Sequence, residues 1–309
     1  MKAVVIREYG GRETLRMEEL PLPSIEEDEV LIRVHAAGVN PVDWMVRSGF
    51  LKGMLDYEFP LILGWDVSGV VERAGSSVTG LSPGDEVFAL PDIQRNGAYA
   101  QFVAVKAGTV ALKPASVDHL QAASIPLAAL TAWQALFDAA DLQPGQSVLV
   151  HAAAGGVGCF AVQLAKWRGA QVTGTASSVN EEFLLDLGAD LVIDYSRTPF
   201  EERVRGVDVV LDSMGGEVRE RSWGVLREGG VLVSIVGPPD EARAVASGVR
   251  ARSVFVVPDA GQLTTIAGLV DTGVVRPCVT RVLPLEEAAR AHEMSETRHT
   301  RGKIVLKVP

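Results

Sequence analysis

Cysteine is scarce in this 309-residue sequence, which has only Cys159 and Cys278. Two thiols so far apart exclude a disulfide framework and a four-thiolate zinc site, so we expect a protein of the reducing cytoplasm. Positive charge is also in short supply, because 29 Lys and Arg face 39 Asp and Glu, a net charge of −10. This balance excludes a general attraction to nucleic acid or anionic membranes. The expected partner is a small molecule or another protein.

Long hydrophobic runs are missing as well. The four apolar residues 3–6 are too few for a signal peptide and predict a strand. The apolar stretch 148–162 is interrupted by His151 and three glycines, whereas a membrane span needs about 20 continuous apolar residues. The five histidines lie without the spacing of metal ligands, and we expect no bound metal.

The pattern of polar and apolar residues changes along the chain. Short β-like runs separated by Gly, Pro, Asn and Asp continue to about residue 113, and an Ala/Leu-rich helical stretch follows at 118–141. From residue 146 strands alternate with helices, which predicts an α/β protein with a doubly wound parallel sheet. Strands are expected near 148–150, 171–175, 191–193, 207–211, 231–236 and 254–257, and later at 279–283 and 304–308. We divide the chain into residues 1–120 with 260–309, and residues 121–259.

The strand predicted at 254–257 is β-branched, uncharged and last in its sheet, so it should form an apolar edge. Pairing of that edge with a second copy predicts a homodimer. The alternative is a monomer in which the helix at 262–271 shields the edge.

A glycine-rich turn joins the strand 148–150 to the following helix. Gly155 allows close backbone approach to a pyrophosphate at the helix N-terminus, and Gly158 allows close packing of helix on strand. Ala153 stands where the strict G-x-G-x-x-G pattern has its first glycine. In a strand-turn-helix context this loop favours dinucleotide binding over a purely structural turn.

The end of the next strand indicates which dinucleotide is bound. An NAD enzyme carries Asp or Glu about 20 residues past the glycines, but this chain has Ser177 and Ser178 there. Two hydroxyls can donate to a 2′-phosphate, which predicts NADPH, although no Arg or Lys stands beside them. Ser178 and Glu181 also have the spacing of a helix capping box, and both roles are compatible.

With these motifs, the chain resembles the zinc-independent quinone oxidoreductase branch of the medium-chain dehydrogenase/reductase superfamily. The resemblance covers nearly the whole length and rests on the segments 37–43, 64–71, 97–100, 152–158, 187–190, 208–216 and 301–303. It implies a GroES-like catalytic module from residues 1–120 and 260–309, and a Rossmann NADP-binding domain from residues 121–259, with the cofactor in the cleft between them. Zinc-dependent relatives carry their ligands at positions that here hold Asn40, Trp65 and Asp66, which cannot assemble a Cys/His site.

The resemblance also implies roles for individual residues. Asn40 and Asp43 would be catalytic residues near nicotinamide and substrate. The implied cofactor contacts are Thr131 at the nicotinamide, Ala154, Gly155, Gly156 and Val157 at the pyrophosphate, Ser177 and Tyr195 at the adenosine, Ile235, Gly237 and Val256 on the nicotinamide side, and Arg301 with Lys303 from the tail. Structural alternatives stay open, with Asp43 as a cap of the helix 44–48, Tyr195 as a strand-end aromatic, and Ile235 and Val256 as sheet core.

The sequence thus predicts an oxidoreductase that moves hydride from NADPH to a quinone or an activated enone without metal. Its proton comes from solvent or from a tyrosine such as Tyr57 or Tyr99. The alternatives are an enoyl-thioester or 2-alkenal double-bond reductase on the same scaffold, and a dinucleotide-binding protein of low activity.

Overall fold

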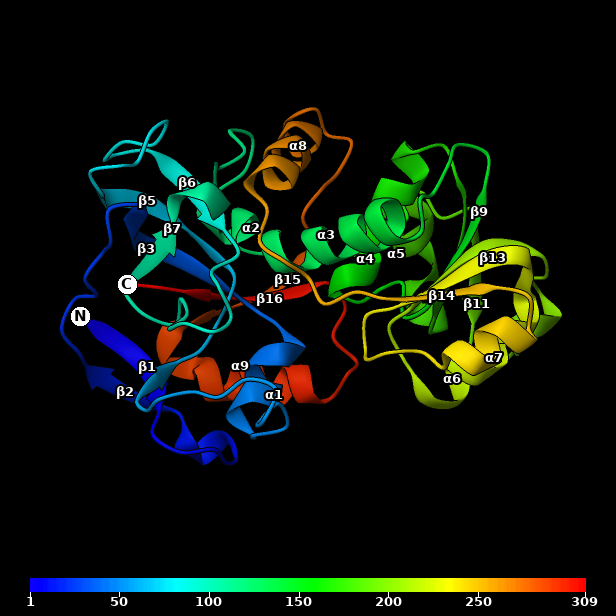
Figure 1. Cartoon of the computed structure of the whole chain (residues 1–309), viewed down its shortest axis with the longest axis horizontal. Coiled ribbons are helices and arrows are strands. Elements are labelled where there is room, and N and C mark those ends of the chain that lie inside the picture. The colour runs from blue at the N-terminus through cyan, green and yellow to red at the C-terminus, as the bar shows by residue number, and fades with distance from the viewer. The chain divides into compact units, whose positions relative to one another are not determined.

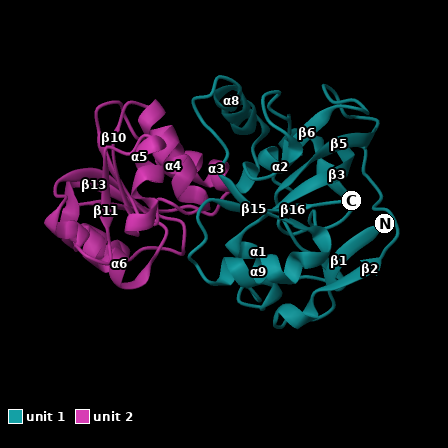
Figure 2. Ribbon diagram, turned by 180° about the vertical axis from the view of Figure 1, so that it is seen from behind, with its two compact units in different colours: residues 1–127, 258–309 teal, residues 128–257 magenta.

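The computed structural model describes residues 1–309 and divides into two compact units (Figures 1 and 2). Unit 1 contains residues 1–127 and 258–309, and unit 2 contains residues 128–257. The chain leaves unit 1 within one helix and returns to it after the last strand of unit 2. No helix combines the length and the apolar character that a membrane crossing requires.

Unit 1 is built mostly from antiparallel strands, with one parallel pair, β15 and β16, and a few helices. A three-stranded sheet has the order β2-β1-β4, and a seven-stranded sheet has the order β15-β16-β3-β5-β6-β8 with β7 also paired to β3. The C-terminal strand therefore lies inside the sheet, between β15 and the long strand β3. The strands are β1 (Lys2–Ile6), β2 (Arg16–Glu19), β3 (Glu29–Val39), β4 (Leu61–Ile62), β5 (Val67–Ala74), β6 (Glu86–Ala89), β7 (Phe102–Lys106), β8 (Val110–Leu112), β15 (Val279–Pro284) and β16 (Lys303–Lys307). The α-helices are α1 (Pro41–Arg47), α2 (His119–Ala122), α8 (Ala260–Asp271) and α9 (Ala288–Glu296).

Unit 2 is a six-stranded parallel sheet in the order β11-β10-β9-β12-β13-β14. This order confirms the predicted doubly wound sheet. Helices α4 and α5 cover one face and α6 lies on the opposite face (Figure 2). The strands are β9 (Ser147–Val150), β10 (Gln171–Ala176), β11 (Leu191–Asp194), β12 (Val207–Asp212), β13 (Leu226–Ser234) and β14 (Arg250–Ser253). The α-helices are α3 (Pro126–Trp133, begun in unit 1 and continued by a π-helix at Gln134–Ala139), α4 (Gly156–Trp167), α5 (Glu181–Asp186), α6 (Gly216–Ser222) and α7 (Glu241–Ala246).

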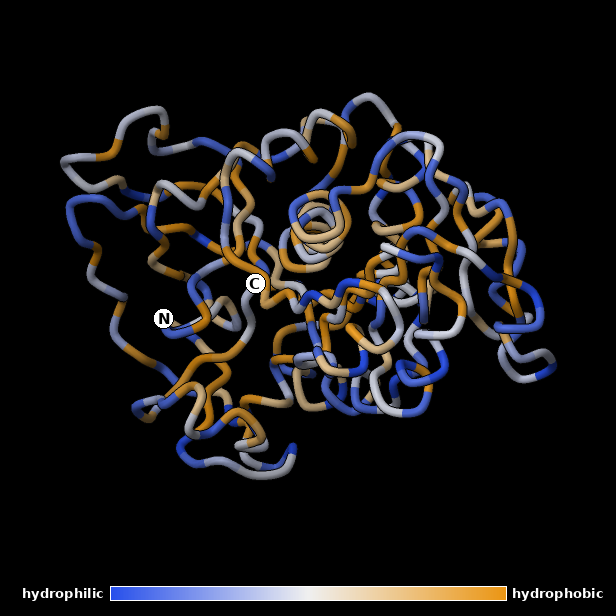
Figure 3. The backbone as a smooth tube through the Cα atoms, turned by 45° about the vertical axis from the view of Figure 1, so that its right-hand side comes forward, coloured by the Kyte–Doolittle hydropathy of each residue, from blue (hydrophilic) through white to orange (hydrophobic).

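The core of unit 2 explains why its strands read as continuous apolar runs. Leu149, Val210 and Leu232 come from three neighbouring strands and are fully buried in one cluster with Trp223. Both faces of a doubly wound sheet are covered, so alternation of polar and apolar residues is lost. Figure 3 shows the hydrophobic colour along interior segments and the hydrophilic colour on many outer loops.

The glycine-rich turn tolerates its unusual alanine because a neighbouring strand makes room. A Cβ atom added to Gly174 of β10 would lie only 2.7 Å from the Cβ of Ala153. A Cβ on Gly158 would lie 2.5 Å from the carbonyl oxygens of both Ala152 and Ala153. The methyl group absent from residue 174 thus offsets the one present at residue 153, while position 158 still requires glycine.

Two local predictions were wrong. Residues 254–257 form no strand, and the edge strand is instead β14, whose Arg250 and Arg252 make it charged. The edge strand lies at 250–253 because these residues pair with residues 231–234 of the neighbouring strand β13. Ser178 does not cap α5, because it begins a 3-10 turn and Asn180 is the N-cap residue.

Candidate active site

Three buried polar side chains meet at neighbouring strand ends in unit 1. Asn40 directly follows β3, Asp66 directly precedes β5, and Lys303 opens β16, the other neighbour of β3. The Lys303 ammonium donates to Asn40 Oδ1 and, over 2.9 Å, to Asp66 Oδ2. Asn40 Nδ2 donates to the same Asp66 oxygen over 2.8 Å, which closes a triangle. No more than 3% of any of these residues is exposed.

Asp43 lies next to this triangle in the first turn of α1. Its Oδ2 accepts from the Asn40 backbone N–H at 2.7 Å and from the Tyr99 hydroxyl at 2.8 Å, while its buried Oδ1 has no hydrogen-bond partner. Burial raises the pKa of Asp43 to about 7, although both hydrogen bonds and the Lys303 charge oppose the rise. Asp43 is therefore not the N-cap of a helix at 44–48, because Asn40 is the N-cap of α1 and Asp43 completes the capping box from the third helical residue.

Neither tyrosine considered as a proton donor has a free hydroxyl hydrogen. Tyr99 donates to Asp43, and Tyr57 donates to the Ile93 carbonyl oxygen at 2.8 Å. Burial raises the pKa of both phenols. Both hydroxyls are therefore poor acids at neutral pH.

The glycine-rich turn in unit 2 is supported by a buried histidine. His151 contacts Thr175 Oγ1 at 3.2 Å and Ser222 Oγ at 2.9 Å through its two ring nitrogens. Thr175 Oγ1 also accepts from the N–H of Ala152, the residue after His151. Gly155 is the N-cap of α4 and has no side chain to cap it, so the first N–H groups of the helix can meet an anion. Ala154 lies in the turn just before Gly155, and Gly156 and Val157 are the first two residues of α4.

A cationic side chain that the sequence analysis did not identify, Arg197, lies near the ends of β10 and β11. Ser177 follows β10 and Tyr195 follows the adjacent β11, where the Tyr195 N–H reaches the Ala176 oxygen. Arg197, two residues further, has a side chain that is 78% exposed and lies 3.4 Å from Asp194. The available signal was that neighbouring parallel strands end at the same edge of the sheet. Hydrogen bonds from Ser196, and a smaller contribution from Ser178, lower the pKa of Asp194, so a carboxylate also lies near this edge.

The loop after β13 holds Ile235 and Gly237, and an arginine fixes its course. Arg219 of α6 pairs with buried Asp212 at 2.6 Å and donates to Ser234 Oγ at 2.8 Å. It also reaches the carbonyl oxygens of residues 236, 237 and 238. Ile235 is half-buried and lies just past the strand, and Gly237 is exposed with a φ of 101°. Arg219 was not among the predicted site residues.

The remaining predicted contacts are placed as follows. Thr131 is buried in α3, and Val256 is half-buried in the extended segment 254–257. That segment is held in unit 2 by Gln134, whose amide bonds both the N–H and the carbonyl oxygen of Val257. Arg301 is exposed just before β16, whereas the Lys303 ammonium is committed to Asn40 and Asp66.

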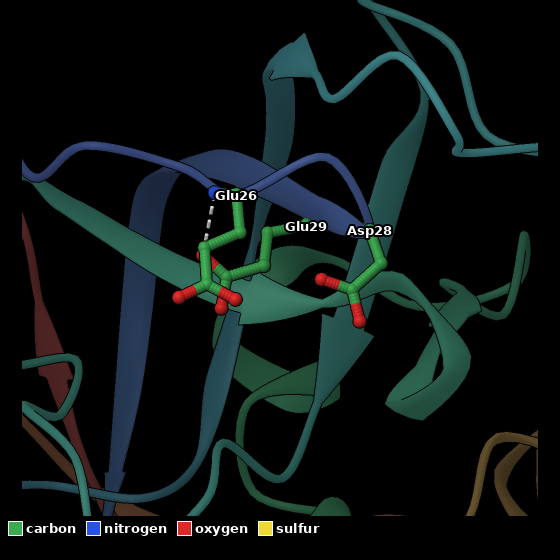
Figure 4. A group of neighbouring side chains, drawn as sticks. All are labelled: Glu26, Asp28 and Glu29. Carbon is green, nitrogen blue, oxygen red and sulfur yellow. Dashed lines mark hydrogen bonds between the residues drawn. The ribbon is translucent and has the colours of Figure 1, made fainter.

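One acidic group stands apart from these residues. Glu26, Asp28 and Glu29 bring their carboxylates together at the start of β3 (Figure 4). Arg95 already pairs with Glu29, and Lys106 pairs with Asp28 at 3.1 Å. We assign this cluster no metal.

Comparisons with known proteins agree with this architecture. Residues 26–115 match the alcohol dehydrogenase GroES-like domain, and residues 187–306 match the family described as zinc-binding dehydrogenase. Together the two folds and the glycine-rich turn define an oxidoreductase with a GroES-like and a Rossmann unit. The chain belongs to the medium-chain dehydrogenase/reductase superfamily, in its quinone oxidoreductase and RTN4IP1-like branch.

Three similar proteins illustrate that branch. The mouse (Mus musculus) mitochondrial NAD(P)H oxidoreductase RTN4IP1 is 36% identical over all of this chain and 89% of its own length. The chloroplastic NADPH-dependent alkenal/one oxidoreductase of Arabidopsis thaliana is 38% identical over 99% of this chain and 79% of its own. The Escherichia coli quinone oxidoreductase, solved in complex with NADPH, is 30% identical with a TM-score of 0.90 over 99% of this chain and all of that chain.

The zinc named by the second family does not fit the residues of this chain. At the ligand positions Asn40 and Asp66 bind the Lys303 ammonium, and the Trp65 indole N–H donates to the Arg95 carbonyl oxygen at 3.1 Å. One carboxylate and one amide, both bonded to a cationic side chain, do not form a tetrahedral site for zinc.

Proposed function

We propose that this protein transfers a hydride from NADPH to a quinone or an activated enone without a metal. The observation that carries the proposal is the Asn40 amide. Its oxygen faces an ammonium and one N–H faces Asp66, which leaves its second N–H without a protein acceptor. That N–H suits the carbonyl oxygen of an electron acceptor. The activities for which the alkenal/one and quinone oxidoreductase relatives are named support the same acceptor chemistry.

The proposed steps for this chain's own residues are binding and charge stabilisation, and bound NADPH would supply the hydride. The turn from Ala154 to Val157 would hold the pyrophosphate through backbone N–H groups. The adenosine would be held by Ser177 and Tyr195, with Arg197 as a nearby cation. We assign the nicotinamide side to Thr131, Ile235, Gly237 and Val256, and a further cofactor contact to Arg301 of the tail.

At the acceptor, negative charge develops on the carbonyl oxygen as hydride arrives. A fixed N–H donor at that oxygen stabilises the charge, and removal of one such donor costs about 100-fold or more in rate in well-studied enzymes. Asn40 is our candidate donor, and Asp43 supports it by accepting from the Asn40 backbone N–H. Because Tyr57 and Tyr99 already donate to protein atoms, we assign the final proton to solvent.

The test is a turnover assay in which NADPH oxidation is followed with quinones, 2-alkenals, other enones and enoyl thioesters. We expect turnover with a quinone or an enone, unaffected by prolonged chelation. The second candidate, a 2-alkenal double-bond reductase, is favoured by the 38% identity to the Arabidopsis enzyme, and higher kcat/KM for alkenals would select it. Tight NADPH binding without any turnover would indicate a dinucleotide-binding protein instead.

Replacement of Ser177 by Asp should reverse the cofactor preference. The new carboxylate would repel the 2′-phosphate of NADPH and could accept from the ribose hydroxyls of NADH. We expect kcat/KM for NADPH to fall by about tenfold or more while that for NADH rises. Steady-state kinetics with both cofactors measures this, with Ser177→Ala as the control that removes the hydroxyl without adding charge. A wild-type preference for NADH would contradict the hydroxyl argument.

The homodimer and the cytoplasmic location stay predictions. The homodimer now rests on the exposed Phe255 and Val257 side chains of segment 254–257, since the edge strand itself is charged. The cytoplasmic location rests on cysteine usage alone.

A further inference from the structure

The Lys303 side chain is unusual because a lysine is buried at the end of a strand with only 3% exposure. Its partners come from distant parts of the sequence, Asn40 at a separation of 263 residues and Asp66 at 237. The register explains the meeting, since Ile304 lies opposite Val39 and Ala37 lies opposite Val67. Three adjacent strands therefore deliver one cation, one amide and one carboxylate to the same point.

The space for this triangle is prepared by a glycine. A Cβ on Gly38 would lie 2.6 Å from Asp66 Oδ2 and 2.3 Å from the Ala123 carbonyl oxygen. The other Asp66 oxygen accepts from the Leu127 N–H at 2.6 Å. Asp66 is thus bonded on both oxygens, and its buried charge is neutralised by Lys303.

The ammonium also determines how the Asn40 amide is oriented. An ammonium can only donate, so the amide oxygen must face Lys303 and the NH₂ group must face Asp66. A charged donor on the amide oxygen draws electron density away from the amide nitrogen, and hydrogen bonds linked in this way strengthen one another. The N–H left over for an acceptor is therefore both fixed in direction and a stronger donor.

We propose that the Lys303 ammonium is a built-in substitute for a metal ion: it neutralises Asp66, fixes and polarises the Asn40 amide, and closes this position to zinc. Lys303 is then a positioning residue rather than a direct cofactor contact. Its effect on turnover rests on the proposed function of Asn40, whereas its effects on metal content and stability do not.

The first measurement uses the wild-type protein. After incubation with excess zinc and desalting, elemental analysis should find far less than one zinc per chain, and neither zinc nor a chelator should shift Tm. Stoichiometric zinc, or a Tm that falls on chelation, would overturn the proposal even if the enzyme proves inactive.

The second measurement separates positioning from folding. The double variant Lys303→Met/Asp66→Asn leaves no unpaired buried charge, so we expect a Tm near that of the wild type and a much larger Tm loss in Lys303→Met alone. The double variant should still lose about tenfold or more in kcat, with KM for NADPH changed less than about twofold, because its amide is no longer fixed or polarised. A purely structural lysine would give wild-type kcat in the double variant, and that result would refute the positioning role.

Controls make both outcomes interpretable. The pair Arg33 and Glu72 joins the same strands β3 and β5 but is half-exposed, so Arg33→Met/Glu72→Gln should leave Tm and kcat almost unchanged. If the double variant does not fold, Lys303→Arg keeps the charge but presents it as a planar fork. We expect Lys303→Arg to lower kcat, and an unchanged kcat in that variant would contradict the proposal. Absence of wild-type turnover would count against the proposed function, and the zinc and Tm results would still decide the metal claim.

Discussion

A Gly156→Val variant will fold like the wild type and bind NADPH about 100-fold more weakly, or worse. Gly156 is the first residue of α4, directly after the N-cap Gly155, where the helix N–H groups are unpaired. A branched side chain there would occupy the space through which a pyrophosphate approaches the backbone. A 100-fold loss corresponds to about 2.7 kcal/mol of binding free energy. Titration of NADPH by calorimetry, with circular dichroism as the check on folding, measures the effect.

Gly158→Val is the matched control, because it lies in the same turn but meets protein atoms. Its Cβ would lie 2.5 Å from two carbonyl oxygens, so this variant should lose stability rather than affinity alone. Unchanged NADPH affinity in a folded Gly156→Val variant would remove the turn from the cofactor site.

Acid will destabilise the protein by about 3 kcal/mol between pH 6.5 and 4, because two buried histidines resist protonation. Burial lowers the pKa of His151 to about 4 and that of His292 to about 3. Below pH 6.5 the unfolded chain binds protons that these folded imidazoles do not, so stability falls as pH falls. Asp43 opposes this with its raised pKa of about 7, because the folded carboxyl takes up its proton before the unfolded one. Two histidines against one aspartate leave a net loss toward acid.

Denaturant unfolding at several pH values in this range tests the sign. His292→Gln removes one of the two buried histidines and should make the loss of unfolding free energy between pH 6.5 and 4 clearly smaller than in the wild type. Replacement of the exposed His299 by Gln is the control and should retain the wild-type slope. Stability that rises steadily from pH 6.5 to 4 in the wild type would show that Asp43 dominates. Three neighbouring groups also act on the pKa of Asp43: Tyr99 and Lys303 lower it, and Asp66 raises it.

The sequence was most informative where local pattern and global fold agree. The alternation of apolar strands and helices after residue 146 predicted the parallel sheet, because covered strands must be apolar on both faces. The same rule misplaced the edge strand, since segment 254–257 is the more β-like one but 250–253 has the hydrogen-bonding neighbour. Local propensity cannot decide between adjacent segments when pairing is settled by a strand 20 residues away.

The candidate site was predictable only where its chemistry is local. The glycine-rich turn and Ser177 follow from one strand-turn-helix unit. The other contacts of the site depend on tertiary neighbours. They are the hydrogen bonds from Lys303 to Asn40 and Asp66, the hydrogen bonds of Asp43 with Asn40 and Tyr99, and the hydrogen bonds from Arg219 to three carbonyl oxygens. A single sequence shows these residues but not which of them meet.

The insertion of β16 between β15 and β3 has a consequence for the order of events during synthesis. Unit 2 is one continuous stretch and can fold as soon as its residues have left the ribosome. The sheet of unit 1 lacks an inner strand until residues 303–307, which follow unit 2 in the sequence, have also emerged. Until then Asp66 has no cation, and the edge of β3 that pairs with β16 is open to other chains. In a nascent or truncated chain, the aggregation-prone surface should therefore be the open edge of β3, which lies in unit 1, the unit whose first residues are translated before those of unit 2.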